Sequence, residues 1–172
     1  MFLWFNGLAG QSPLVDTVVF YTAEYLGAVL LLLWFWYAWH HRERFHVAHT
    51  WLVIVTTTSS WIVAHIIKWL IAIPRPFTVL HETTVLIGGQ ISNGFPSGHA
   101  ALFFAFATAC YLYYPKLFPY YLLAAIAIAI SRVIAGVHWP LDIVGGAVLG
   151  ITVTFFVDTI WRWYVLKRVR RA

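Results

Sequence analysis

Long apolar runs dominate the sequence and constrain it more than any other feature. One run extends from Thr17 to Trp39 with a single acidic residue, Glu24, and a second extends from Val47 to Ile73. A helix that crosses a bilayer needs about 20 predominantly apolar residues, so each run is long enough to span a membrane. With 62% hydrophobic and only 10% charged residues, the chain is too apolar for a water-soluble globular protein. It is therefore predicted to be an integral membrane protein.

Three further apolar segments follow these two runs. They cover residues 97–114, 118–135 and 140–165. Pro74 and Pro76 forbid regular helix beyond the second run. A short N-terminal segment with Trp4 and Phe5 cannot span a bilayer and is predicted to lie in its interface. The predicted fold class is all-α: a polytopic membrane helical bundle with about five transmembrane helices, in a single domain over residues 1–172.

Cations at the edges of the apolar segments set the expected orientation. With five spans, one side of the membrane receives Arg42, Arg44, Lys116, Arg162, Lys167, Arg168, Arg170 and Arg171. The positive-inside rule makes that side cytoplasmic. The formal net charge of +5 therefore indicates topology and contact with the lipid bilayer, and no nucleic-acid partner is expected. The opening residues lack the charged flank of a cleavable signal, so the N-terminus is expected to be mature.

Three polar clusters interrupt the apolar segments. They are Lys68 with Arg75 and Pro76, the run Pro96-Ser97-Gly98-His99, and Ser131-Arg132 with His138 and Asp142. Because successive helices alternate in direction, all three clusters are expected on the face opposite the basic loops. A cation inside a membrane is costly unless it is paired or solvated, so three cations with few carboxylates indicate an anionic ligand. Arg75 and Arg132 offer planar donors that match phosphate oxygens, and Lys68 adds a compact charge.

The remaining residues of these clusters predict chemistry on a bound phosphate. His138 and Asp142 are four residues apart at a helix start, where the carboxylate fixes the tautomer and leaves the other ring nitrogen free to attack phosphorus. His99 could protonate the leaving oxygen and then activate water. Ser97 and Gly98 would present a hydroxyl and backbone N–H groups at a helix N-terminus. Each cluster alone also fits a structural role, as a Ser-capped helix start or a structural His–Asp pair. No metal or other cofactor is expected.

Three further residues are candidate substrate contacts. Glu24 lies within an apolar run, where an acidic group is costly enough to indicate function, with an interfacial or helix-bonded role as the alternative. It would face the site or hold a cation that binds a second phosphate. His81 and Glu82 lie in the loop near the clusters, where plain solvation is the alternative. In the last apolar segment Asp158 is expected to pair with Arg162, one helical turn away.

The three clusters resemble the signature motifs of the type 2 phosphatidic acid phosphatase superfamily, K-x6-RP, PSGH and SR-x5-H-x3-D. The resemblance covers about residues 61–150. It implies an all-helical membrane fold and metal-independent hydrolysis of a lipid phosphate through a phosphohistidine on His138. It also implies His99 as the acid and Asp142 as the partner of His138. The phosphate ligands that it implies are Lys68, Arg75, Arg132, Ser97 and Gly98.

Within the superfamily, the opening FNGLAGQSPLVDTVVFYTAEYLGAV is similar to bacterial undecaprenyl-diphosphate phosphatases of the bacitracin-resistance type. This resemblance implies conversion of undecaprenyl diphosphate to undecaprenyl phosphate, which recycles the cell-wall carrier lipid. The protein would lie in the bacterial cytoplasmic (inner) membrane with its site facing the periplasm or the cell exterior. Several such enzymes carry Asp at the position of Gly98.

Other functions remain open on the same residues. Gly at position 98 is shared with lipid A, phosphatidylglycerophosphate and phosphatidate phosphatases, so each of these activities is an alternative. A non-enzymatic lipid-phosphate binder or transporter is the alternative from another class. Vanadate haloperoxidases share the motifs, but they are soluble proteins, and the apolar spans of this chain argue against them.

Overall fold

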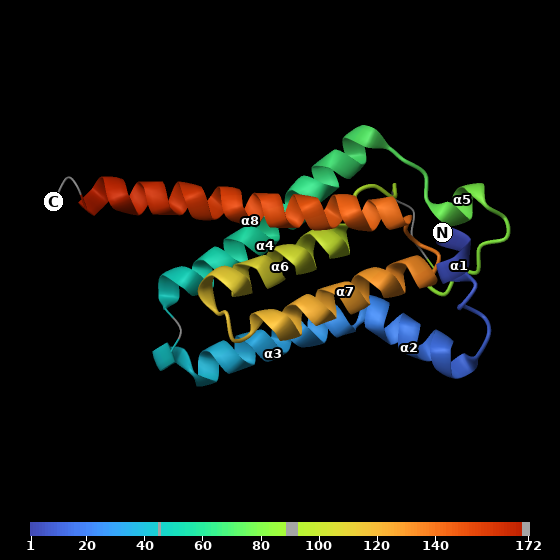
Figure 1. Ribbon diagram of the computed structural model, residues 1–172, viewed down its shortest axis with the longest axis horizontal. Coiled ribbons are helices and arrows are strands. Elements are labelled where there is room, and N and C mark those ends of the chain that lie inside the picture. The colour runs from blue at the N-terminus through green and yellow to red at the C-terminus, as the bar shows by residue number, and fades with distance from the viewer. Residues whose placement is uncertain (45, 89–92, 170–172) are drawn as a thin grey trace.

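The structure, a computed structural model, is helical throughout the residues that it describes, which are 1–44, 46–88 and 93–169. Its helices are α1 (Phe2–Asn6), α2 (Pro13–Glu24), α3 (Leu26–His40), α4 (Val47–Ile71), α5 (Pro76–Val79), α6 (Gly98–Tyr113), α7 (Phe118–Ile134) and α8 (Pro140–Val169), with one 3₁₀ turn at Arg42–Arg44 (Figure 1). No strand occurs within these described ranges. The predicted all-α membrane bundle is confirmed, and α5 adds a short helix to a stretch expected as loop.

Helices occupy all five predicted apolar segments, but they differ in length. Among the described residues, two helical stretches, Val47–Val79 and Pro140–Lys167, are long and apolar enough to cross a membrane. A third span results if α2 and α3 are counted together. The apolar helices α6 and α7 contain 16 and 17 residues, fewer than the roughly 20 that a straight span requires.

The first apolar run is broken, whereas one continuous helix from Thr17 to Trp39 was predicted. Helix α2 ends at Glu24, α3 begins at Leu26, and the two helices are bent by 50° relative to each other. Beyond the bend α3 closely approaches α6, since a Cβ atom at Gly27 would lie 2.1 Å from the ring of Phe103. The run contains no proline, which is the usual sequence sign of such a break.

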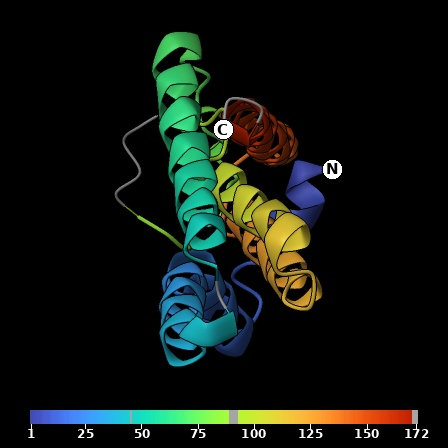
Figure 2. The same ribbon diagram turned by 90° about the vertical axis from the view of Figure 1, so that its left-hand side faces the viewer.

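Helix α6 forms the centre of the bundle. It packs against α4, α7 and α8 (Figure 2). All of its alanines are buried. Glycines bring α8 into backbone contact with it. A Cβ atom at Gly146 would lie 2.5 Å from the carbonyl oxygen of Ser97, and one at Gly150 would lie 2.3 Å from that of Ala101. Small residues allow close helix packing of this kind in membranes, and here they place the N-terminal ends of α6 and α8 side by side.

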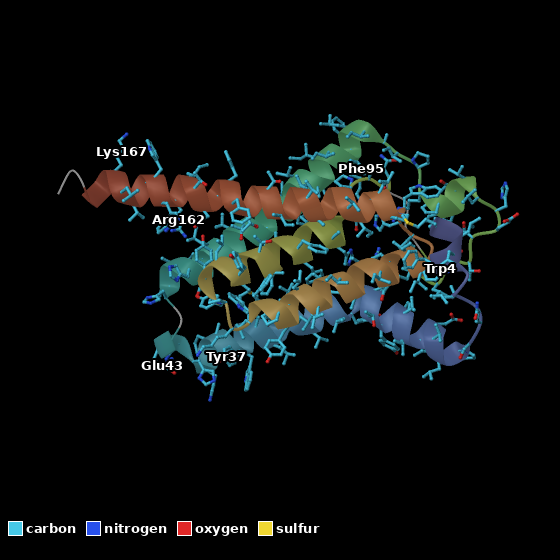
Figure 3. All side chains as sticks on the ribbon, in the orientation of Figure 1. Trp4, Tyr37, Glu43, Phe95, Arg162 and Lys167 are labelled. Carbon is cyan, nitrogen blue, oxygen red and sulfur yellow. The ribbon has the colours of Figure 1, made fainter. Side chains whose placement is uncertain are left out.

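The two ends of the bundle differ in character. Helices α1 and α5, the C-terminal end of α7 and the N-terminal ends of α6 and α8 gather at one end (Figure 1). The 3₁₀ turn, the α6–α7 connection and the C-terminal end of α8 lie at the other, where Glu43 and Lys167 are found (Figure 3). The expected ion pair of Asp158 and Arg162 on α8 is confirmed, with 2.7 Å between Oδ2 and Nε. Arg170 and Arg171 lie outside the described residues.

Candidate active site

The end of α4 delivers two of the three predicted cations to the site. Lys68 lies in the last turn of α4, which stops at Ile71, and Ala72 then adopts a left-handed conformation with φ of 52°. The sequence predicted a helix through the whole second apolar run, as far as Ile73. Instead, an extended segment carries Arg75 to the N-terminus of α5. Both side chains are nevertheless buried.

Arg75 contacts the loop that joins α7 to α8. Its Nη1 donates a hydrogen bond of 2.7 Å to the carbonyl oxygen of Val137. The same nitrogen lies 3.5 Å from Nε2 of His138. The first and third clusters, 62 residues apart in the sequence, therefore meet at this guanidinium group.

The carboxylate of Asp142 holds the other side of the His138 ring. Its Oδ2 lies 3.1 Å from Nδ1 of His138 and accepts a 2.9 Å hydrogen bond from the backbone N–H of Trp139. Both side chains are 2% exposed. Gly94 packs directly on the carboxylate, because a Cβ atom there would lie 2.9 Å from Oδ2. Gly94 and Trp139 were missed in the sequence, although each is close to a motif.

The second cluster begins helix α6. Ser97 caps the helix, with its Oγ accepting a 3.4 Å hydrogen bond from the N–H of Ala100. The backbone N–H of Ser97 donates to the carbonyl oxygen of Asp142 at 2.9 Å, which ties the second cluster to the third. His99 follows in the first turn, half-buried and within electrostatic range of His138 and of the three cations. The alternative role of Ser97 as a helix cap is therefore confirmed. Its hydroxyl group can still donate its proton to a ligand.

Arg132 reaches the site from the last turn of α7 and is 1% exposed. Its Nη1 donates to Oε1 of Glu24 at 2.6 Å and to the carbonyl oxygen of Ala23 at 3.3 Å. Among the residues that the structure describes, Nε of Arg132 has no hydrogen-bond partner. Glu24, predicted as a candidate substrate contact, thus bonds directly to a site cation.

The cations act together on His138, which lies in the loop between α7 and α8. Burial of the imidazole, together with Arg75, Arg132 and Lys68, lowers the pKa of His138 well below its ordinary value. The ring is therefore neutral at neutral pH, which is the form that can act as a nucleophile.

The other two candidate contacts lie apart from this group. His81 and Glu82 are exposed in the turn after α5. Within the described part of the chain, no hydrogen bond or ion pair joins either of them to the clustered side chains.

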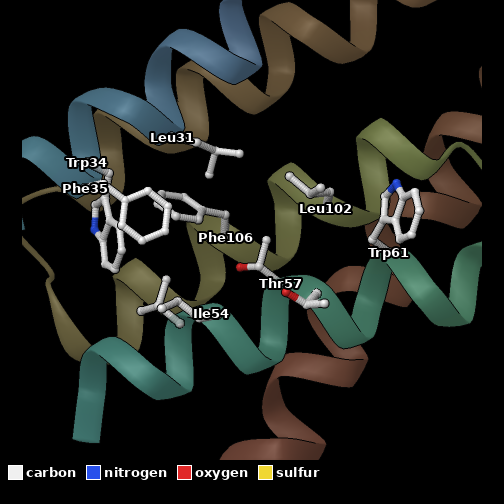
Figure 4. A pocket seen from close by; sticks show the side chains of 10 residues that line it. Leu31, Trp34, Phe35, Ile54, Thr57, Trp61, Leu102 and Phe106 are labelled. Carbon is white, nitrogen blue, oxygen red and sulfur yellow. The ribbon is translucent and has the colours of Figure 1, made fainter. Parts of the chain in front are cut away.

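A lateral cavity runs along the flank of the bundle between α3, α4 and α6. It has a volume of about 260 Å³ and is lined by Leu31, Trp34, Phe35, Val53, Ile54, Thr57, Thr58, Trp61, Leu102 and Phe106 (Figure 4). Phe35 and Trp61 are about half exposed, so the cavity opens to the outside of the bundle. Trp61 also approaches the site, since its Cδ1 lies 3.8 Å from the position of a Cβ atom at Gly98.

A second apolar cavity, the rim cavity, lies at the helix ends beside Asp142. Its volume is about 390 Å³, and its lining residues are Met1, Phe2, Ile73, Phe95, Trp139, Pro140, Leu141 and Asp142. The site is thus flanked by apolar surface on two sides.

Comparison with known proteins shows the family of the chain. The family model described as the PAP2 superfamily matches residues 49–167. The bacitracin transport permease protein BcrC of Bacillus licheniformis is 32% identical over 158 residues, covering 91% of this chain and 76% of that protein. The undecaprenyl-diphosphatase BcrC of Bacillus subtilis is 26% identical over 172 residues, with coverage of 92% and 87%.

A solved structure shares the fold. The crystal structure of Aquifex aeolicus LpxE superposes with a TM-score of 0.75 and 24% sequence identity, and the superposition covers 92% of each chain. The bundle described above is therefore also found in an experimentally determined protein.

Proposed function

The chain belongs to the PAP2 superfamily and is a multi-pass membrane phosphatase, and from this premise we propose that it hydrolyses undecaprenyl diphosphate to undecaprenyl phosphate. The reaction would proceed without a metal, through a phosphohistidine on His138, at the outer face of the cytoplasmic membrane. The substrate is supported by the similarity to the Bacillus subtilis undecaprenyl-diphosphatase. The alternative is a lipid A or a phosphatidylglycerophosphate or phosphatidate phosphatase.

One observation carries the proposed chemistry: the opposite surroundings of the two His138 ring nitrogens. Nδ1 contacts Asp142, while Nε2 faces the guanidinium group of Arg75. A phosphoryl group bonded to Nε2 would therefore meet Arg75 at once, with Lys68 and Arg132 also in electrostatic range. A transporter or simple binder has no need of an imidazole fixed in this manner.

The proposed reaction has two steps. In the first, Nε2 of His138 forms a bond to phosphorus while the bond from phosphorus to the leaving oxygen breaks, and His99 donates a proton to that oxygen. In the second, water attacks phosphorus, His99 accepts the proton of the water, and the bond between nitrogen and phosphorus breaks. Inorganic phosphate and the shortened lipid are the products.

The lateral cavity is the proposed place for the first part of the lipid chain. It is almost wholly apolar, and it begins next to Gly98 and continues along α4 and α6 away from the site. An apolar chain there would remain in the hydrocarbon region while the diphosphate reaches the cations.

A lipid panel tests the substrate and the nucleophile together. Purified protein in detergent with EDTA would be given undecaprenyl diphosphate, lipid A, phosphatidylglycerophosphate and phosphatidate, and phosphate release would be measured. We expect fastest release from undecaprenyl diphosphate, and loss of release by at least about 10³-fold in His138→Ala. Acid-labile phosphate should be trapped on the wild-type protein and be absent from the variant.

The same assay can also contradict the proposed substrate or the proposed mechanism. Faster hydrolysis of another lipid of the panel would refute undecaprenyl diphosphate as the preferred substrate but would leave the mechanism unchanged. Activity that disappears with EDTA, or that survives in His138→Ala, would refute the mechanism. His40→Gln, which alters an exposed histidine at the far end of the bundle, is the control.

Filling the lateral cavity tests the path of the chain. Leu102→Trp should slow hydrolysis of undecaprenyl diphosphate but leave a short-chain prenyl diphosphate unaffected. The matched control is Leu122→Trp, which alters a different apolar crevice between α6, α7 and α8. If Leu102→Trp has no effect while Leu141→Trp in the rim cavity does, the chain passes by the rim instead.

A further inference from the structure

Glu24 lies outside the part of the chain that carries the motifs, yet it contacts one of their cations. The family model matches residues 49–167, whereas Glu24 ends helix α2. Its Oε1 accepts a 2.6 Å hydrogen bond from Nη1 of Arg132, and the two form an ion pair. The Glu24 side chain is 30% exposed, whereas that of Arg132 is 2% exposed. The cation is thus enclosed, and the carboxylate closes one side of it.

The contacts of Arg132 are unevenly distributed over its guanidinium group. Nη1 has two acceptors, Oε1 of Glu24 and the carbonyl oxygen of Ala23. Nε, by contrast, is buried and has no hydrogen-bond partner among the described residues. Since a guanidinium group is planar and rigid, two acceptors on one nitrogen fix the direction of the others. A buried donor without a partner indicates a ligand that completes it.

The break between α2 and α3 makes this arrangement possible. Helix α2 packs against α7 and ends at Glu24, where a bend of 50° separates it from α3. Both acceptors, Ala23 O and Glu24 Oε1, therefore come from the last turn of α2, directly before the bend.

We propose that Glu24 is a positioning residue for phosphate binding: its carboxylate holds Arg132 so that Nε is directed at the bound phosphoryl group. This inference rests on the proposed function, because it assigns Arg132 to the phosphate. Glu24 itself does not contact the substrate. It acts through Arg132, and its loss lets the guanidinium group rotate away from the position in which it stabilises the transferred phosphoryl group.

A double-mutant cycle tests the coupling. Glu24→Ala should lower kcat about 100-fold with a smaller change in KM, the scale of loss expected from a misplaced catalytic contact. Glu24→Gln keeps an acceptor oxygen and should lose at most about tenfold. Because Glu24 acts only through Arg132, Glu24→Ala should have no further effect in an Arg132→Ala background. If the two losses multiply independently, the proposal is wrong.

The chain offers a matched control. Asp158 and Arg162 form another carboxylate–guanidinium ion pair, at 2.7 Å, within α8 and toward the other end of the bundle. Asp158→Asn should leave kcat and KM unchanged. If Glu24→Gln and Glu24→Ala both behave like Asp158→Asn, Glu24 has only a structural role.

Binding of inorganic phosphate separates this inference from the proposed function. Phosphate should raise the thermal unfolding midpoint of the wild-type protein in detergent, and Glu24→Ala should need a higher phosphate concentration for the same rise. If no lipid of the panel is hydrolysed while this dependence is present, the proposed function fails and the positioning role stands. If Glu24→Ala does not fold, Glu24→Asp, whose shorter side chain withdraws the carboxylate from Arg132, carries both measurements, and wild-type kcat and phosphate binding in this variant would overturn the proposal.

Discussion

The His138 ring is held in one tautomer by its neighbours. Oδ2 of Asp142 faces Nδ1 and already accepts the N–H of Trp139. An ionised carboxylate can only accept hydrogen bonds, so the ring proton must lie on Nδ1, and Nε2 carries the free electron pair. The direction of attack in the proposed mechanism thus follows from one carboxylate oxygen.

Asp142→Asn should therefore abolish most of the activity without removing a side chain. The amide oxygen would take the place of Oδ2 and would still accept from Trp139 and from Nδ1, but the negative charge that stabilises the phosphorylated imidazole would be lost. Loss of one electrostatic contact of this kind costs about 10²- to 10³-fold in an enzyme active site, and we expect a loss in kcat of that size here. Asp158→Asn is the control in the same phosphate-release assay. A loss below tenfold would exclude this role.

The lowered pKa of His138 predicts a pH dependence of stability. Below about pH 6.5 the unfolded chain binds a proton at this imidazole while the native protein does not. The free energy of unfolding therefore decreases as the pH falls, by up to about 1.4 kcal/mol per pH unit from this group. Thermal unfolding in detergent between pH 7 and 5 should show a steeper decline for the wild-type protein than for His138→Gln. Equal declines would contradict the burial of a neutral ring.

At the scale of helices, the contact of α6 with α8 aligns two parts of the site. Gly146 lies one turn after Asp142 and meets the carbonyl oxygen of Ser97. The N–H of Ser97 in turn donates to the carbonyl oxygen of Asp142. The absence of a side chain at one position of α8 thus allows the PSGH segment and the His–Asp pair to lie against each other.

Gly146→Ala should separate these two segments. Alanine favours helix over glycine by about 1 kcal/mol, yet its Cβ atom would lie 2.5 Å from the backbone of Ser97, so a helix must shift. We expect a net destabilisation of about 1–3 kcal/mol together with reduced phosphate release. Gly88→Ala is the control, because a Cβ atom there meets nothing within 4 Å. Unchanged activity and stability in Gly146→Ala would show that the helices adapt.

For the whole molecule, the site and the basic residues occupy opposite ends of the bundle. The motif residues gather at the end that holds α1 and α5, and Arg162 and Lys167 lie toward the other (Figure 3). The positive-inside rule predicts that the basic end lies in the cytoplasm and that the site faces outward.

Cysteine labelling in intact bacteria tests this orientation. The native Cys110 is buried and should not react. A membrane-impermeant maleimide should label Gly88→Cys, near the site, and should label Lys116→Cys, at the other end, only after the cells are opened. Both positions are exposed. The reverse pattern would place the site in the cytoplasm.

The sequence predicted those parts of the fold that local composition determines. The apolar segments gave the positions of the helices, and the polar clusters gave the residues that meet at the site. The break at Glu24 could not be predicted, because the run contains no proline and Arg132, the partner of Glu24 on α7, is more than 100 residues away. The early end of α4 at Ile71 and the packing of Gly94 on Asp142 likewise depend on tertiary contacts.

The opening of the lateral cavity on the flank of the bundle has a kinetic consequence. The cations lie at the helix ends, whereas Phe35 and Trp61 border an apolar opening on the side. Under the proposed function, inorganic phosphate departs into water and the lipid returns sideways among its neighbours, so neither product crosses the path of the other. Encounters with substrate then occur by diffusion in two dimensions, and turnover follows the mole fraction of substrate at the surface and is insensitive to its bulk concentration.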